Sequence, residues 1–176
     1  SDIFTESRAA VAGGVTSYME MPNTKPQTTT LELLEEKYAL AATRSMANYS
    51  FYLGATNQNI RELVKVNPAD VCGVKVFMGS STGNMLVDDL DTLNRIFAEV
   101  PTLIATHCGD EPTIQKNLSY YKNIYGDNIG CEFHPFIRSE EACYKSSSFA
   151  VEMAVKYGTR LHVLHLSTAR EMSLFS

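Results

Sequence analysis

The sequence predicts an α/β fold in which short parallel strands alternate with longer helices. Short apolar runs rich in β-branched residues recur along the 176-residue chain, and segments of helical period separate them. A regular strand–helix alternation is typical of a parallel sheet covered by helices. No Pro-, Gly- or Ser-rich linker divides the sequence. We therefore expect a single domain over residues 1–176.

Five segments have the length and composition of buried strands. They are Val15–Met21, Ser50–Thr56, Val71–Met78, Leu103–His107 and Leu161–Leu166.

The expected helices begin at residues whose side chains can accept a backbone hydrogen bond. These residues are Thr5, Thr30, Asp88 or Asp89, Ser139 and Thr168. Glu171 follows Thr168 by three residues, which is the spacing of a capping box. The aromatic segment Asn117–Arg138 interrupts the pattern, and we expect it to form a long loop of the kind that covers an active site.

The number of strand–helix units is informative about the architecture. A closed (β/α)8 barrel needs eight units and about 250 residues. The five units found here predict a partial (β/α)8 barrel whose first and last strands are missing, with an open five-stranded sheet as the alternative. An open barrel exposes two strand edges. We therefore expect a homo-oligomer or association through those edges.

Composition excludes several classes of partner. The chain carries 15 Lys and Arg against 20 Asp and Glu and contains no basic run, which argues against nucleic-acid binding. No apolar run approaches the roughly 20 residues of a membrane span. The N-terminal residues lack the layout of a signal peptide. The four cysteines form no Cys-x-x-Cys pair, so we expect reduced thiols in a cytoplasmic protein.

Three candidate functional side chains lie where strands are expected to end. Lys75 is on the third strand, His107 ends the fourth, and His165 is near the end of the fifth. Functional residues of parallel α/β proteins gather at this edge. Strand alternation predicts that His165 faces the same side as Val163, and that His162 points the other way, beneath the helices. A single strand histidine is more often a core residue, but two at equivalent strand ends indicate a metal site.

Lys75 lies between Val74 and Val76 in a run of buried character. Lysine is rarely buried unless its charge is compensated. Two interpretations follow. Either the amine reaches solvent at the strand end, or burial lowers its pKa and leaves a neutral amine. A neutral amine can add carbon dioxide and become an anionic metal ligand.

Four motifs in chain order carry a family resemblance. They are MPNTKP (Met21–Pro26), VKVFMGSSTGN (Val74–Asn84), His-Cys-x-Asp (His107–Asp110) and RLHVLHLSTA (Arg160–Ala169). Together they resemble the cyclic amidohydrolases, and the dihydroorotase family most closely. The resemblance implies a zinc-dependent (β/α)8 enzyme for a small-molecule substrate. It also implies interconversion of L-dihydroorotate and N-carbamoyl-L-aspartate in pyrimidine biosynthesis.

The resemblance assigns a role to four residues. Lys75 matches the carboxylated lysine that bridges two zinc ions, His107 and His165 match histidine metal ligands, and Asn23 matches a residue that contacts the substrate carboxylate. The catalytic Asp, a general acid and base, is expected beyond Ser176, and the first His-x-His metal motif before residue 1. We therefore expect these 176 residues alone to be inactive.

Other interpretations stay open. Relatives commonly have Glu where this chain has Gly109. The substrate alternatives are those of a hydantoinase (dihydropyrimidinase) or an allantoinase, although GSSTGN and RSEEAC (Arg138–Cys143) favour dihydroorotase. An alternative of another class is a catalytically inactive, amidohydrolase-like assembly partner. Residues given a structural interpretation are Cys108, His134, His162, Tyr120, Tyr121 and Tyr125.

Overall fold

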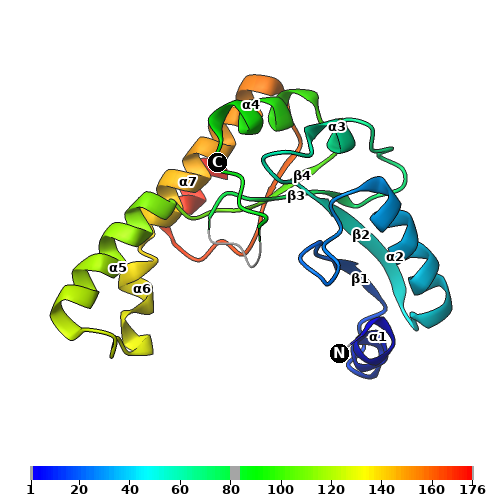
Figure 1. Ribbon diagram of the computed structural model, residues 1–176, viewed down its shortest axis with the longest axis horizontal. Coiled ribbons are helices and arrows are strands. Elements are labelled where there is room, and N and C mark those ends of the chain that lie inside the picture. The colour runs from blue at the N-terminus through cyan, green and yellow to red at the C-terminus, as the bar shows by residue number, and fades with distance from the viewer. Residues whose placement is uncertain (1, 80–83, 176) are drawn as a thin grey trace.

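Five parallel strands lie side by side in chain order in the computed structural model, which describes residues 2–79 and 84–175. The strands are β1 (Ser17–Glu20), β2 (Asn48–Gly54), β3 (Gly73–Phe77), β4 (Ile104–His107) and β5 (Leu161–Val163). Figure 1 shows that the sheet forms an arch with helices along its outer side. This arrangement confirms the predicted partial barrel of strand–helix units. β1 and β5 are the edge strands of the described sheet.

Helices follow each strand, and one precedes β1. The α-helices are α1 (Ile3–Ala12), α2 (Leu31–Arg44), α3 (Ile60–Leu63), α4 (Leu90–Glu99), α5 (Glu111–Tyr125), α6 (His134–Ile137) and α7 (Glu140–Tyr157). Two 3₁₀ segments are η1 (Cys131–Phe133) and η2 (Arg170–Phe175). Within the described residues, no helix is both long and apolar enough to span a membrane.

Three predicted helix starts are confirmed. Thr30, Asp89 and Ser139 each accept a hydrogen bond from a backbone N–H in the first turn of α2, α4 and α7. The prediction for the first helix was wrong by one turn. Asp2 is its N-cap, and Thr5 is the third helical residue, whose hydroxyl and backbone N–H complete a reciprocal capping box with Asp2.

The core lies between the outer face of the sheet and the helices. Val74, Val76 and Ile104 are fully buried there. Leu93, Ile96, Phe97 and Ala150, from α4 and α7, belong to the same hydrophobic cluster. Because successive strand residues alternate between faces, the residues between these apolar ones point toward the inner side of the arch. Lys75 is one of them.

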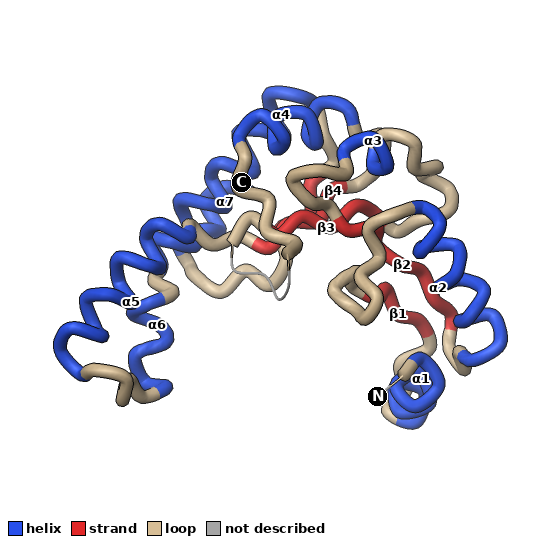
Figure 2. Tube along the Cα trace, viewed as in Figure 1, coloured by secondary structure: helices blue, strands red, loops and turns tan. Residues whose placement is uncertain are grey.

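The aromatic segment expected to be a loop is mostly helical, so that prediction was wrong. Asp110 caps α5, and the chain continues through η1 and α6 beside it (Figure 2). Tyr121 and Tyr125 are four residues apart and therefore share one helix face. The Phe133 ring covers that face, with centroids 5.0 Å from Tyr121 and 4.6 Å from Tyr125. The predicted packing role is confirmed for Tyr121 and Tyr125, whereas the side chain of Tyr120 is largely exposed.

Candidate metal centre

Strand register brings Lys75 and His107 to the same face of the sheet. In the β3–β4 ladder, Lys75 pairs with Ala105 and Phe77 pairs with His107. Paired residues of neighbouring parallel strands point to the same side, and residues two apart share a face. Lys75, Phe77 and His107 therefore lie together on the inner face, toward the carboxyl ends of the strands.

His107 and His165 meet directly. The Nδ1 atom of His107 and the Nε2 atom of His165 are 2.8 Å apart, and the ring centroids are 4.7 Å apart. Burial, followed by the nearby His165 and Lys75, lowers the pKa of His107 from 6.5 to about 4. His107 is therefore neutral at physiological pH, which is the form of imidazole that binds metal ions.

The backbone route to this contact differs from the predicted one. β5 ends at Val163. His162 pairs with Ala105, which pairs in turn with Lys75, so His162 lies on the same face of the sheet as Lys75. The His162 side chain is exposed there. The predicted faces of His162 and His165 were therefore wrong. His165 reaches His107 because the chain has left the extended conformation, with φ +40° at His165. Strand alternation does not apply beyond the end of a strand.

Lys75 is buried, with 2% of its surface exposed. Its Nζ donates to the carbonyl oxygen of Val76 at 3.1 Å and lies 3.6 Å from the centroid of the Phe77 ring. None of the ion pairs within residues 2–79 and 84–175 includes Lys75. Burial lowers the pKa of Lys75 from 10.5 to about 7. The solvent-reaching interpretation was wrong, because the side chain is buried, and the lowered pKa agrees with the desolvated-amine interpretation.

Asn23 lies in the loop that follows β1, at the same edge of the sheet. The loop folds back on itself, because the Thr28 N–H donates to the Pro22 carbonyl at 2.9 Å. The Gly54 N–H donates to the Thr28 carbonyl at 2.8 Å, and Gly54 pairs with Lys75. The Asn23 side chain is exposed. The β1–α2 loop is thus fixed to the strand that neighbours Lys75.

These donors fit part of a metal site. In the described part of the chain, no three His, Cys, Asp or Glu side chains gather as a metal-binding group. A catalytic zinc ion takes three protein ligands in addition to water or substrate. The two histidines supply converging nitrogens, and Lys75 is a further donor on the same face, so the donor types suit a metal.

The other polar residues near this edge have packing roles. The Cys108 thiol lies 3.4 Å from the Thr106 hydroxyl, and burial raises its pKa. A Cβ atom on Gly109 would meet its nearest atom, Ile114 Cδ1, at 3.4 Å, which is ordinary contact. Glycine is therefore not sterically required at position 109. Of the GSSTGN motif, residues 80–83 lie outside the described residues.

Sequence reasoning missed a buried polar cluster behind the His165 loop. Glu171 is 3% exposed and accepts a hydrogen bond from the Thr168 hydroxyl at 2.8 Å and another from the Ser147 hydroxyl. The predicted capping box was wrong, because Glu171 bonds the side chains of Thr168 and α7, and η2 is a 3₁₀ segment. The Thr-x-x-Glu spacing was the available signal.

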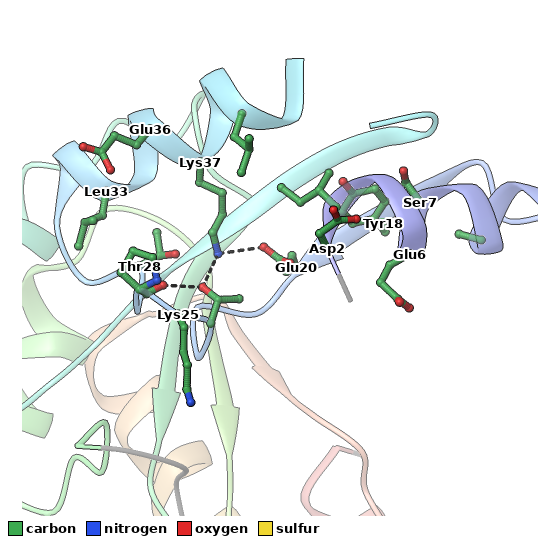
Figure 3. A pocket seen from close by; sticks show the side chains of 15 residues that line it. Asp2, Glu6, Ser7, Tyr18, Glu20, Lys25, Thr28, Leu33, Glu36 and Lys37 are labelled. Carbon is green, nitrogen blue, oxygen red and sulfur yellow. Dashed lines mark hydrogen bonds and ion pairs between the residues drawn. The ribbon is translucent and has the colours of Figure 1, made fainter. Parts of the chain in front are cut away.

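A cavity of about 770 Å³ lies elsewhere, between α1, β1 and α2. Its lining includes an ion pair in which Lys37 Nζ lies 2.9 Å from Glu20 Oε2 (Figure 3). None of the candidate metal ligands lines this cavity. It is therefore distinct from the candidate metal centre.

Comparisons of sequence and of structure with known proteins find related enzymes. A scan against models of protein families finds no match. A dihydroorotase of Methanosarcina mazei is 30% identical over 97% of this chain and 37% of its own length. An allantoinase of Streptomyces avermitilis is 28% identical over 98% of this chain and 39% of its own length. The solved structure of an L-hydantoinase (dihydropyrimidinase) from Arthrobacter aurescens superposes with a TM-score of 0.90, at 28% identity, over 98% of this chain and 39% of that one.

The chain spans less than two fifths of the length of these relatives. Over that portion, sequence and fold agree on one group of enzymes. The resemblance to the cyclic amidohydrolases, the group that includes dihydroorotases, hydantoinases and allantoinases, is confirmed over nearly the whole of this chain.

Proposed function

We propose that the full-length protein is a zinc-dependent dihydroorotase of the cytoplasm, which interconverts L-dihydroorotate and N-carbamoyl-L-aspartate in pyrimidine biosynthesis. The observation that carries the proposal is the contact between His107 and His165 on the face that also holds Lys75. The dihydroorotase relatives support the choice of substrate. All four cysteines lie among the described residues as free thiols, which is in keeping with a reducing compartment.

Lys75 would act as a metal bridge after modification. In its unprotonated form the amine would attack the carbon of carbon dioxide. An N–C bond forms, the electron pair of one C=O π bond moves to oxygen, and the nitrogen releases one proton to solvent. The product is a carbamate anion with two oxygen donors. His107 and His165 would bind the same centre through ring nitrogens. Zinc, when bound, lowers the pKa of water and polarises the scissile carbonyl.

Asn23 would orient the substrate. Its amide can donate two hydrogen bonds, which suits the carboxylate of dihydroorotate. The loop that carries Asn23 is fixed to Gly54, next to Lys75 in the sheet. This position favours a substrate whose carboxylate lies toward β1 and whose ring lies toward β3 and β4. General acid–base chemistry is assigned to an Asp outside this chain.

A hydantoinase is the second candidate, favoured by the TM-score of 0.90 against the L-hydantoinase structure. The hydantoin ring is also a cyclic amide, and the same donors would serve it. An inactive assembly partner is less well supported. Burying an amine at 2% exposure, with no carboxylate partner among the residues that the structure describes, is costly, and an assembly partner does not require it.

The test is to measure bound zinc and ring opening together on the full-length protein. We expect about two zinc ions per chain and hydrolysis of dihydroorotate, both lost in Lys75→Ala. Opening of hydantoin rings alone would transfer the proposal to the hydantoinases. A folded, metal-free and inactive protein would favour the assembly partner.

A further inference from the structure

The carboxylate of Glu171 is buried and bonded to Thr168, three residues after His165. One of its oxygens accepts from the Ser147 hydroxyl on α7, and the other accepts from the Thr168 hydroxyl at 2.8 Å. Ser147 is fully buried. Among the residues that the structure describes, no ion pair includes Glu171. The two hydroxyls therefore offset the cost of burying this carboxylate.

The loop in front of Glu171 is held at both ends. Before His165, the Leu164 N–H donates to the Thr106 carbonyl of β4 at 3.0 Å. After it, the Ser167 hydroxyl donates to the His165 carbonyl at 2.8 Å, and Thr168 is tied to Glu171. His165 itself has φ +40°, which is unfavourable for a residue with a Cβ atom. Such a conformation persists only where the surrounding structure imposes it.

We propose that Glu171 is a positioning residue, which holds His165 against His107 by tying Thr168 to Ser147. The hydrogen bonds of Glu171 thereby fix the loop to α7. This helix has 18 residues, begins after its N-cap Ser139, and packs on the sheet. Supporting residues behind a metal ligand orient it and raise its affinity for the metal. The link to metal binding rests on the proposed function, whereas the His107–His165 contact belongs to the metal-free protein.

The test variant is Glu171→Gln in the full-length protein. Glutamine has the same shape, but only its oxygen can accept, so one hydroxyl would have to accept from the amide NH2 instead, and that hydroxyl's own proton would lose its acceptor on residue 171. The matched control is Glu152→Gln, at an exposed position on α7, the helix that carries Ser147. If Glu171→Gln fails to fold, Thr168→Val removes the same tie from the loop side, and Thr168→Ser restores it.

The first readout is ¹⁵N NMR of the histidine rings in the metal-free protein. In the wild type and in Glu152→Gln we expect the signature of a hydrogen bond between His107 and His165. In Glu171→Gln and Thr168→Val we expect that signature to be lost, with several resonance positions for His165. An unchanged His165 signature in a variant that only melts earlier would overturn the proposal, because Glu171 would then be merely structural.

The second readout is zinc affinity by competition with a chromophoric chelator. We expect Glu171→Gln to bind zinc roughly 10- to 100-fold more weakly than the wild type. Adding Ser147→Ala to Glu171→Gln should weaken zinc affinity little further, since the two substitutions disrupt the same connection between Thr168 and Ser147. If His165→Ala leaves zinc affinity unchanged, the proposed function fails, and the metal-free NMR readout still decides the role of Glu171.

Discussion

Burial of the Lys75 amine should make the metal-free protein less stable than a variant without it. We consider Lys75→Met, which keeps a long unbranched side chain and removes the charge. Burial lowers the pKa of Lys75 from 10.5 to about 7. Between these two values the unfolded chain binds the proton and the folded chain does not. The free energy of unfolding therefore decreases as the pH falls below 10.5, the pKa of lysine in the unfolded chain, and the decrease levels off below about pH 7.

The magnitude follows from the two pKa values. At about pH 7 the burial of this ionisable amine costs about 4 kcal/mol, and at about pH 9.5 it costs about 1 kcal/mol. Lys75→Met should therefore be more stable than the wild type at pH 7, and its advantage should shrink by about 3 kcal/mol between these pH values. Differences in packing contribute equally at both pH values and cancel in this comparison.

The assay is urea unfolding of both full-length proteins after metal removal in buffer depleted of carbon dioxide. Lys116→Met, at an exposed position on α5, is the control and should show no such change with pH. A difference between Lys75→Met and wild type that is the same at both pH values would refute the desolvated amine. Lys75→Met should also be unable to bind a bridging metal, so the variant would gain stability and lose metal binding.

Three further predictions concern the strand ends and the metal. Gly79→Ala should destabilise the protein by about 1–3 kcal/mol, because the new Cβ atom would collide with the Gly109 carbonyl. Gly109→Ala is the control and should change thermal stability little. Equal losses of stability in the two variants would contradict this packing. Asp110→Ala should cost about 1 kcal/mol in urea unfolding by removing the α5 N-cap, and Asp110→Asn should recover most of it. Chelation should lower the melting temperature of the wild type but not of His107→Ala, and an equal shift in both would place the metal elsewhere.

Most of the fold could be predicted from local sequence signals. Thr30, Asp89 and Ser139 begin helices because short polar side chains satisfy the first backbone N–H groups. The five strands were found because apolar, β-branched runs are short and well separated. The second half of α5 was predicted as a loop, because its aromatic residues pack on Phe133 from the following segment, and local sequence signals do not show that contact.

The sequence could predict which residues belong to the candidate site, but it could not predict how their side chains are arranged. Lys75 stood out because a lysine between two valines conflicts with burial, and the structure buries it. The position of His165 depends on where β5 ends and on a φ of +40°, and neither follows from strand alternation. The contacts of Glu171 join residues 24 positions apart, so only the folded chain reveals them.

The most direct test of the proposed metal centre is anomalous X-ray diffraction at the zinc edge on crystals of the full-length, zinc-loaded protein. We expect anomalous peaks within bonding distance of the modified Lys75 side chain and of the ring nitrogens of His107 and His165. Peaks elsewhere, with His107 and His165 still hydrogen-bonded to each other and Lys75 unmodified, would contradict this proposal.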